Sequence, residues 1–234
     1  VPMYAADMLA LLAQLHAQAP IETLDWVGTS MGGLIGMGIT GQPGLPLPVP
    51  VRRMVLNDVG PVIEWASLER IGSYVGKSLQ FPNFESAAAA MSQISEGFGP
   101  HTDEQWRKLS QAMVKPNPQG GVVLHYDPKI SAPMALMTRE TAQAGETLLW
   151  QLYDQIQAQV LLIRGADSDL LSASTAQAMA ERGPKAHCTE LEGVGHAPTL
   201  VAPGQVALIR KFLQGEKGLP ASISLAQQAQ EEAE

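Results

Sequence analysis

Cysteine is almost absent from this chain of 234 residues, and a single Cys188 cannot form an intrachain disulfide. No cluster of cysteine and histidine has the spacing of a zinc site, so we expect no metal. No apolar run approaches the roughly 18 to 20 residues of a membrane-spanning helix, and the sequence does not open on a basic segment followed by an apolar one. These absences favour a cytoplasmic protein.

Positive charge is also scarce. Lysine and arginine number 15 against 23 aspartates and glutamates, which gives a formal net charge of −8. Because no basic cluster is present, we expect neither nucleic acid nor a membrane as a partner. A small molecule is the expected substrate.

The most informative segment is Gly-Thr-Ser-Met-Gly-Gly at 28–33, which follows a short apolar run and precedes a helical pattern of small residues. A serine on a sharp turn from strand to helix is held in a strained backbone conformation that exposes its hydroxyl. Gly28 and Gly32 are expected to keep Cβ atoms out of this turn, and Gly33 lets the helix approach the strand. The segment predicts a nucleophile elbow with Ser30 as the nucleophile.

Apolar strands alternate with amphipathic helices along much of the chain, which predicts an α/β fold with an open, mostly parallel sheet. The expected strands are 23–27, 51–56, 160–163 and 186–191. The expected helices of this core are 4–18, the helix after the elbow, 173–182 and 206–213.

The middle of the chain has a different pattern, with short helices broken by glycine and proline. We therefore divide the chain into a first core part at 1–60, a helical cap insertion at 61–159, a second core part at 160–214 and a disordered tail at 215–234. The tail consists largely of alanine, glutamine and glutamate, with little to bury.

A serine hydroxyl needs a base, and His196 is the best of the five histidines for that task. It lies in the loop Gly-Val-Gly-His-Ala-Pro at 193–198, directly after the last expected strand. A parallel sheet places such a loop at the same carboxyl edge as the elbow. The remaining histidines fall in an expected helix, in the insertion or within a strand.

The base in turn needs a carboxylate to fix its tautomer. Asp169 is favoured because it follows the strand at 160–163, and because two leucines directly after it could anchor its loop. Asp167, at the tip of the same turn, is one alternative. Asp58, at the exit of the strand that follows the elbow, is another.

The order Ser30, Asp169, His196, with an insertion between the early and late strands, resembles the α/β-hydrolase superfamily up to about residue 213. The elbow, Leu-Asn-Asp-Val-Gly-Pro at 56–61, Ser-Asp-Leu-Leu at 168–171 and Gly-His-Ala-Pro at 195–198 are similar to segments of bacterial esterases and meta-cleavage product hydrolases. The resemblance implies a cofactor-free serine hydrolase that cleaves a small or medium apolar carboxylic ester through an acyl-enzyme. Hydrolysis of a carbon–carbon bond in a diketone, or a catalytically incomplete fragment or binding version of the fold, are the alternatives.

In this family, several strands and an oxyanion loop precede the helix with which this chain begins. The resemblance therefore implies an N-terminally truncated chain, in which the backbone N–H of Met31 is one oxyanion donor and the second donor is missing. The strand at 23–27 would then expose an unpaired edge, through which the protein could self-associate.

Nine of the twelve aromatic residues lie in the insertion. They could line an apolar substrate pocket, or they could form the insertion's own core. The residues expected to contact substrate are Trp65, Tyr74, Phe81, Trp106 and Met137.

Overall fold

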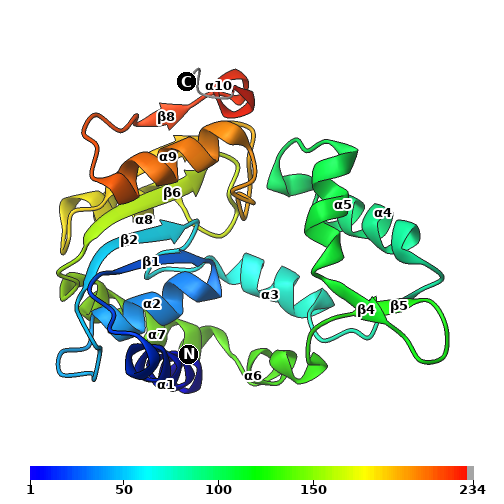
Figure 1. The fold of residues 1–234 in the computed structure, drawn as a ribbon, viewed down its shortest axis with the longest axis horizontal. Helices are drawn as coiled ribbons and strands as arrows, with labels where there is room; N and C mark the ends of the chain where they lie inside the picture. The colour runs from blue at the N-terminus through cyan, green and yellow to red at the C-terminus, as the bar shows by residue number, and fades with distance from the viewer. Residues whose placement is uncertain (231–234) are drawn as a thin grey trace.

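The computed structural model describes residues 1–230 of the chain and centres on a five-stranded sheet in the order β1-β2-β6-β7-β8 (Figure 1). Each pair of neighbouring strands is parallel. The strands are β1 (Leu24–Thr29), β2 (Val51–Asn57), β6 (Gln159–Gly165), β7 (His187–Leu191) and β8 (Ser222–Ile223). The predicted α/β class with a mostly parallel sheet is therefore confirmed.

Successive residues of the central strands point to opposite faces of the sheet. Met54 and Leu56 of β2 join one core cluster, whereas Val55 joins the other. Because helices cover both faces, the middle of these strands is apolar at consecutive positions, as at 54–56 and 160–163. One face packs against α1 (Pro2–Gln18), α2 (Met31–Thr40), α7 (Arg139–Asp154) and α8 (Ala173–Glu181), and the other against α9 (Pro203–Gln214).

β1 is the outermost strand on one side of the sheet in the part of the chain that the structure describes. Its pairing with β2 runs in register from Asp25 opposite Arg53 to Thr29 opposite Asn57. On this edge the side chain of Val27 is 47% exposed. The expected open edge is therefore present among residues 1–230.

The insertion extends to one side of the main sheet (Figure 1). Its helices are α3 (Trp65–Tyr74), α4 (Phe84–Ile94), η1 (Glu96–Phe98), α5 (Asp103–Gln111), η2 (Pro128–Ser131) and α6 (Ala132–Ala135). It also contains an antiparallel sheet in the order β3-β5-β4, formed by β3 (Gln80–Phe81), β5 (Val122–Leu124) and β4 (Val114–Pro116). The helical insertion expected at 61–159 thus also contains strands, which the sequence does not reveal because strands of two or three residues are too short to show a period of two.

α7 closes the chain segment expected to be an insertion, yet its C-terminal end packs into the core. Tyr153 is fully buried there, and its hydroxyl donates a hydrogen bond of 2.6 Å to the carbonyl of Met179 in α8. α7 thus serves as a covering helix of the main sheet.

The expectation of a disordered tail from residue 215 is wrong for the residues that the structure describes. β8 pairs with β7, and α10 (Leu225–Ala229) packs against α9. The buried Gln228 accepts a hydrogen bond from Gln205 and donates one to the carbonyl of Glu192, both at 2.9 Å. Glutamine side chains can be buried when their polar atoms have hydrogen-bond partners. The polar composition of the segment therefore does not exclude an ordered structure. Residues 231–234 of the expected tail lie outside the described residues.

Candidate active site

Ser30 stands alone between β1 and α2, with φ 49° and ψ −119°. A positive φ is strained for a residue that carries a Cβ, and it persists only where the surroundings hold it. Here the Ser30 N–H donates to the carbonyl of Asn57 at 3.0 Å, and the Ser30 carbonyl accepts from the N–H groups of Gly33 and Leu34. The neighbouring strand and the first turn of α2 together hold the serine in the geometry expected of a nucleophile elbow.

Two of the three elbow glycines are required by close contacts. A Cβ on Gly28 would lie 2.5 Å from the backbone of Gly32, and one on Gly33 would lie 2.4 Å from Val59 Cγ1. A Cβ on Gly32 would meet no atom within 4 Å, so the expected crowding at that position is wrong. The Gly32 carbonyl instead accepts a hydrogen bond of 3.1 Å from the indole of Trp26.

His196 joins the serine to a carboxylate. Its Nε2 lies 3.0 Å from Ser30 Oγ, and its Nδ1 lies 2.8 Å from Asp58 Oδ2. Because an ionised carboxylate only accepts, the ring carries its proton on Nδ1, which leaves Nε2 to accept from the serine hydroxyl. In this arrangement the imidazole can take the proton of the hydroxyl while the carboxylate holds the ring in place.

Asp58 is the first residue after β2 and has φ 54°. Its N–H donates to the carbonyl of Ile163 on β6, which fixes the backbone between the two strands. The side chain is fully buried. Its Oδ1 accepts from the N–H of Gly165 at 2.9 Å, and its Oδ2 accepts from the hydroxyl of Ser168 at 2.6 Å as well as from His196. Every contact suits the charged form of a buried carboxylate.

Asp169, the favoured partner of His196 in the sequence analysis, does not contact the histidine, and this expectation is corrected. Its carboxylate is half exposed and forms a bidentate ion pair with Arg70 of α3, in which both N–O distances are 2.8 Å. Partial burial would raise the pKa of Asp169, but the hydrogen bonds and charge of Arg70 outweigh burial and lower it. Asp167, the second alternative, is exposed. Of the three candidates, the structure brings only Asp58 to His196.

Asn57 was not singled out from the sequence, although it ties the elbow to the histidine loop. Its amide donates to Thr29 Oγ1 at 3.0 Å and to the carbonyl of Pro198 at 2.8 Å, and the residue is fully buried. The available signal was a polar residue that ends a buried apolar strand, directly before an aspartate. The two hydrogen bonds of the Asn57 NH₂ group hold it in place, whereas its buried Oδ1 has no hydrogen-bond partner within residues 1–230.

Met31 is the first residue of α2, so its N–H is one of those that a helix leaves without an intrahelical acceptor. The positive end of the helix dipole favours negative charge at the same place. The backbone beside Ser30 is therefore suited to stabilise an oxyanion.

The residues expected to contact substrate do not line a single pocket. Tyr74 and Phe81 line a cavity of about 480 Å³ inside the insertion, here named the cap cavity. Met137 lines a second cavity of about 410 Å³, here named the elbow-side cavity, together with Leu34 of the elbow helix. Trp65 begins α3 and is partly buried.

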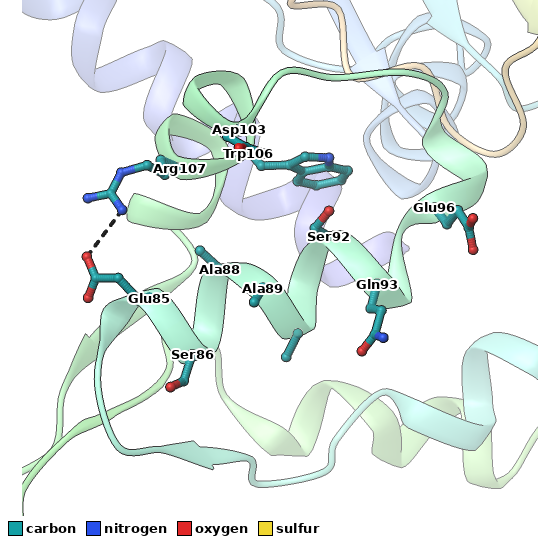
Figure 2. Close-up of a pocket in the computed structure, with 11 residues that line it drawn as sticks. Glu85, Ser86, Ala88, Ala89, Ser92, Gln93, Glu96, Asp103, Trp106 and Arg107 are labelled. Carbon is teal, nitrogen blue, oxygen red and sulfur yellow. Dashed lines mark ion pairs between the residues drawn. The ribbon is translucent and has the colours of Figure 1, made fainter.

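Trp106 lines a third and more open cavity of about 1000 Å³ between α4 and α5 (Figure 2). Figure 2 shows its indole above the alanine-rich side of α4, with an ion pair of 3.2 Å between Glu85 and Arg107 at one end. Trp106 also packs against the ring of His101. It therefore lies apart from the other predicted substrate residues.

Both smaller cavities adjoin segments that carry Ser30, Asp58 or His196. The elbow-side cavity includes Leu34, one helical turn after Ser30, and Pro61, which follows Asp58 closely in sequence. The cap cavity includes Phe98, next to Gly97, whose carbonyl accepts a hydrogen bond of 2.7 Å from the residue before His196. Both cavities are lined in part by α3, since Leu68 lines one and Arg70 and Tyr74 line the other.

Two kinds of feature are absent from residues 1–230. No group of three or more histidine, cysteine, aspartate or glutamate side chains there is arranged to hold a metal ion. No helix in the same part of the chain has both the length and the apolar character needed to cross a membrane.

Residues 2–207 match a family model described as "Alpha/beta hydrolase family". The chain is 46% identical over 219 residues to the 3-hydroxybutyrate-oligomer hydrolase of Cupriavidus necator, which covers 92% of this chain and 72% of that protein. An alpha/beta hydrolase from Novosphingobium aromaticivorans matches with a TM-score of 0.73 and 34% identity, over 92% of this chain and 74% of the other. A hydrolase from Rickettsia typhi matches with a TM-score of 0.77 and 27% identity, over 92% and 69%.

Proposed function

Because the chain belongs to the alpha/beta hydrolase family, we propose that it is a serine hydrolase that cleaves the ester bonds of 3-hydroxybutyrate oligomers. The observation that carries this proposal is the contact series from Ser30 Oγ through His196 to Asp58, with distances of 3.0 and 2.8 Å. The identity of 46% to a hydrolase of such oligomers supports the substrate class.

In the proposed reaction, Ser30 Oγ attacks the ester carbonyl while His196 Nε2 takes its proton. The negative oxygen of the tetrahedral intermediate accepts a hydrogen bond from the N–H of Met31. His196 then returns the proton to the departing 3-hydroxyl of the neighbouring unit. Water, activated by the same imidazole, releases the acyl group from Ser30 as a free acid. Throughout the cycle Asp58 orients the ring and stabilises the imidazolium.

The lining of the two smaller cavities suits an oligoester. Such a chain has ester groups spaced by short methyl-bearing carbon units, and each unit offers apolar surface with few polar atoms. We assign the elbow-side cavity with Met137, and the cap cavity with Tyr74 and Phe81, to the parts of the chain on the two sides of the scissile ester. The apolar lining of both supports this assignment.

The test is release of 3-hydroxybutyrate from its dimer and trimer by the complete protein, with Ser30→Ala as the control. We expect Ser30-dependent turnover of the oligomers and of p-nitrophenyl butyrate, and labelling of Ser30 by a fluorophosphonate. Absence of ester turnover would contradict the proposal.

Two alternatives are distinguished by an assay with a second substrate and by the labelling measurement. Turnover of a ring-cleavage dienoate without any ester turnover would indicate carbon–carbon bond hydrolysis, which uses a similar triad. Failure of a fluorophosphonate to label the folded protein would indicate a binding version of the fold, because labelling requires an activated serine.

A further inference from the structure

The buried carboxylate of Asp58 is held by a second side chain, the hydroxyl of Ser168. Ser168 Oγ lies 2.6 Å from Asp58 Oδ2, the same oxygen that contacts His196. The hydroxyl oxygen also accepts from the N–H groups of Leu170 and Leu171, at 3.3 and 3.1 Å. Because a hydroxyl has one proton and these two N–H groups occupy its acceptor side, the proton is directed at Asp58.

This contact fixes the rotation of the carboxylate. The torsion that turns an aspartate carboxylate is soft, with broad energy wells. Gly165 N–H holds Oδ1, and Ser168 holds one side of Oδ2, so the remaining side of Oδ2 faces His196 Nδ1. Without the hydroxyl, only the Gly165 N–H and the histidine itself would orient the group.

The turn that carries Ser168 is itself anchored, on its other side, to the first helix of the insertion. The carbonyl of Asp169 accepts a hydrogen bond of 2.6 Å from Ser67, and its side chain pairs with Arg70. The Glu64 N–H donates to the carbonyl of Leu170 at 3.2 Å. A residue that orients a catalytic group is effective when its own position is fixed in this way.

We infer that Ser168 is a positioning residue for Asp58, occupying the turn in which the sequence suggested the catalytic carboxylate itself. The inference rests on the proposed function, because it concerns how Asp58 supports the same reaction. Its chemical content is independent of the substrate: the hydroxyl keeps Asp58 Oδ2 aligned with the Nδ1–H of His196.

The test compares Ser168→Ala and Ser168→Thr with Ser172→Ala in the complete protein. Ser172 lies in the same loop and accepts a hydrogen bond from the N–H of Thr175 as the cap of α8, so its variant makes the same chemical change away from Asp58. For Ser168→Ala we expect kcat to fall by about 10- to 100-fold, with KM changed less than about twofold. Ser168→Thr retains the hydroxyl and should recover most of kcat, and Ser172→Ala should keep the kcat of the original protein.

A spectroscopic measurement separates positioning from a general loss of structure. In a proton NMR spectrum, the proton on His196 Nδ1 should give a downfield resonance that disappears in His196→Asn. The chemical shift of this resonance should change in Ser168→Ala. Ser168→Cys, a weaker donor of similar size, should give an intermediate shift and serves if the alanine variant does not fold. An unshifted resonance in the alanine or cysteine variant would overturn the inference.

The inference and the proposed function fail in different ways. If the original protein shows Ser30-dependent ester turnover and Ser168→Ala matches it in kcat, the inference alone is wrong. If the original protein shows no such turnover, the proposed function is wrong, and the resonance still decides whether Ser168 orients Asp58. A fall in kcat with an unchanged resonance and a lowered melting temperature would assign Ser168 a purely structural role and overturn the inference.

Discussion

Exchanging the carboxylate for an amide at Asp58 should abolish most activity, whereas the same exchange at Asp169 should not. In Asp58→Asn, one oxygen can still accept from the Gly165 N–H, which turns the new NH₂ group toward His196. That group donates, so the ring must present Nδ1 as an acceptor and carry its proton on Nε2. A ring in this tautomer cannot accept the proton of Ser30.

The expected magnitude follows from the loss of the correct tautomer. For a triad of this kind, the wrong tautomer lowers kcat by ~10⁴-fold, which corresponds to about 5.4 kcal/mol of transition-state stabilisation at about 1.36 kcal/mol per factor of ten. Asp169 forms an exposed ion pair with Arg70, worth about 0 to 1 kcal/mol of stability. In Asp169→Asn the turn that carries Ser168 is still held by Ser67 and by the Glu64 N–H, so kcat should stay within about threefold.

The assay is kcat for hydrolysis of the 3-hydroxybutyrate trimer, with the folded fraction of each variant measured by thermal unfolding. The unfolding measurement is needed because Asp58 is buried, and an imperfectly paired amide there costs about 1 to 3 kcal/mol of stability. The reasoning is refuted if folded Asp58→Asn retains activity while folded Asp169→Asn loses it. That result would return the catalytic role to the turn after β6.

Three further predictions concern stability. Gly28→Ala places a Cβ 2.5 Å from backbone atoms and should lower the free energy of unfolding by about 2 kcal/mol or more, whereas Gly32→Ala meets open space and should be neutral or stabilising; urea titration of both distinguishes crowding from a general need for glycine. Tyr153→Phe removes one of two hydrogen bonds to the Met179 carbonyl of α8, which still accepts from the Ala186 N–H, and should cost about 0.5 to 1.5 kcal/mol in the same titration; an unchanged midpoint would contradict the 2.6 Å contact. Arg70 keeps the pKa of Asp169 below its unfolded value, so the stability lost in Asp169→Asn should be present above about pH 4 and decrease as the pH falls through the folded pKa. A loss that does not decrease as the pH is lowered would refute this linkage.

The elbow and the core strands were predictable because their signals are local. Glycine spacing around Ser30 and uninterrupted apolar runs such as 160–163 each report on a few consecutive residues. The histidine loop also follows from local sequence, since its place after the last expected strand brings it to the carboxyl edge of the sheet. These features need no knowledge of which strands are neighbours.

The partner of His196 could not be ranked in this way, because it depends on pairings between distant segments. β2 lies between β1 and β6, and Asn57 at the end of β2 pairs with Thr29 at the end of β1. Asp58, the next residue, therefore lies beside Ser30. Asp169 is separated from its strand by a turn and meets Arg70, which lies about a hundred positions earlier in the sequence. The sequence shows each aspartate after a strand, but not the order of the strands in the sheet.

The antiparallel sheet of the insertion and the segment after residue 215 escaped prediction for a related reason. β3, β4 and β5 are each two or three residues long, and β8 pairs over two residues only. Their stability comes from the partners they meet, not from a pattern within themselves.

The contacts between α3 and the turn at 168–171 bear on how this protein could be recombined with its relatives. Ser30, Asp58 and His196 all lie outside residues 61–159, so a chimera could receive a foreign insertion without any change to the three. Such a graft would, however, also exchange Ser67 and Arg70, which hold the turn that carries Ser168. A functional crossover point would therefore lie after α3, so that residues 64–74 are inherited with the core and only the remainder of the insertion is exchanged.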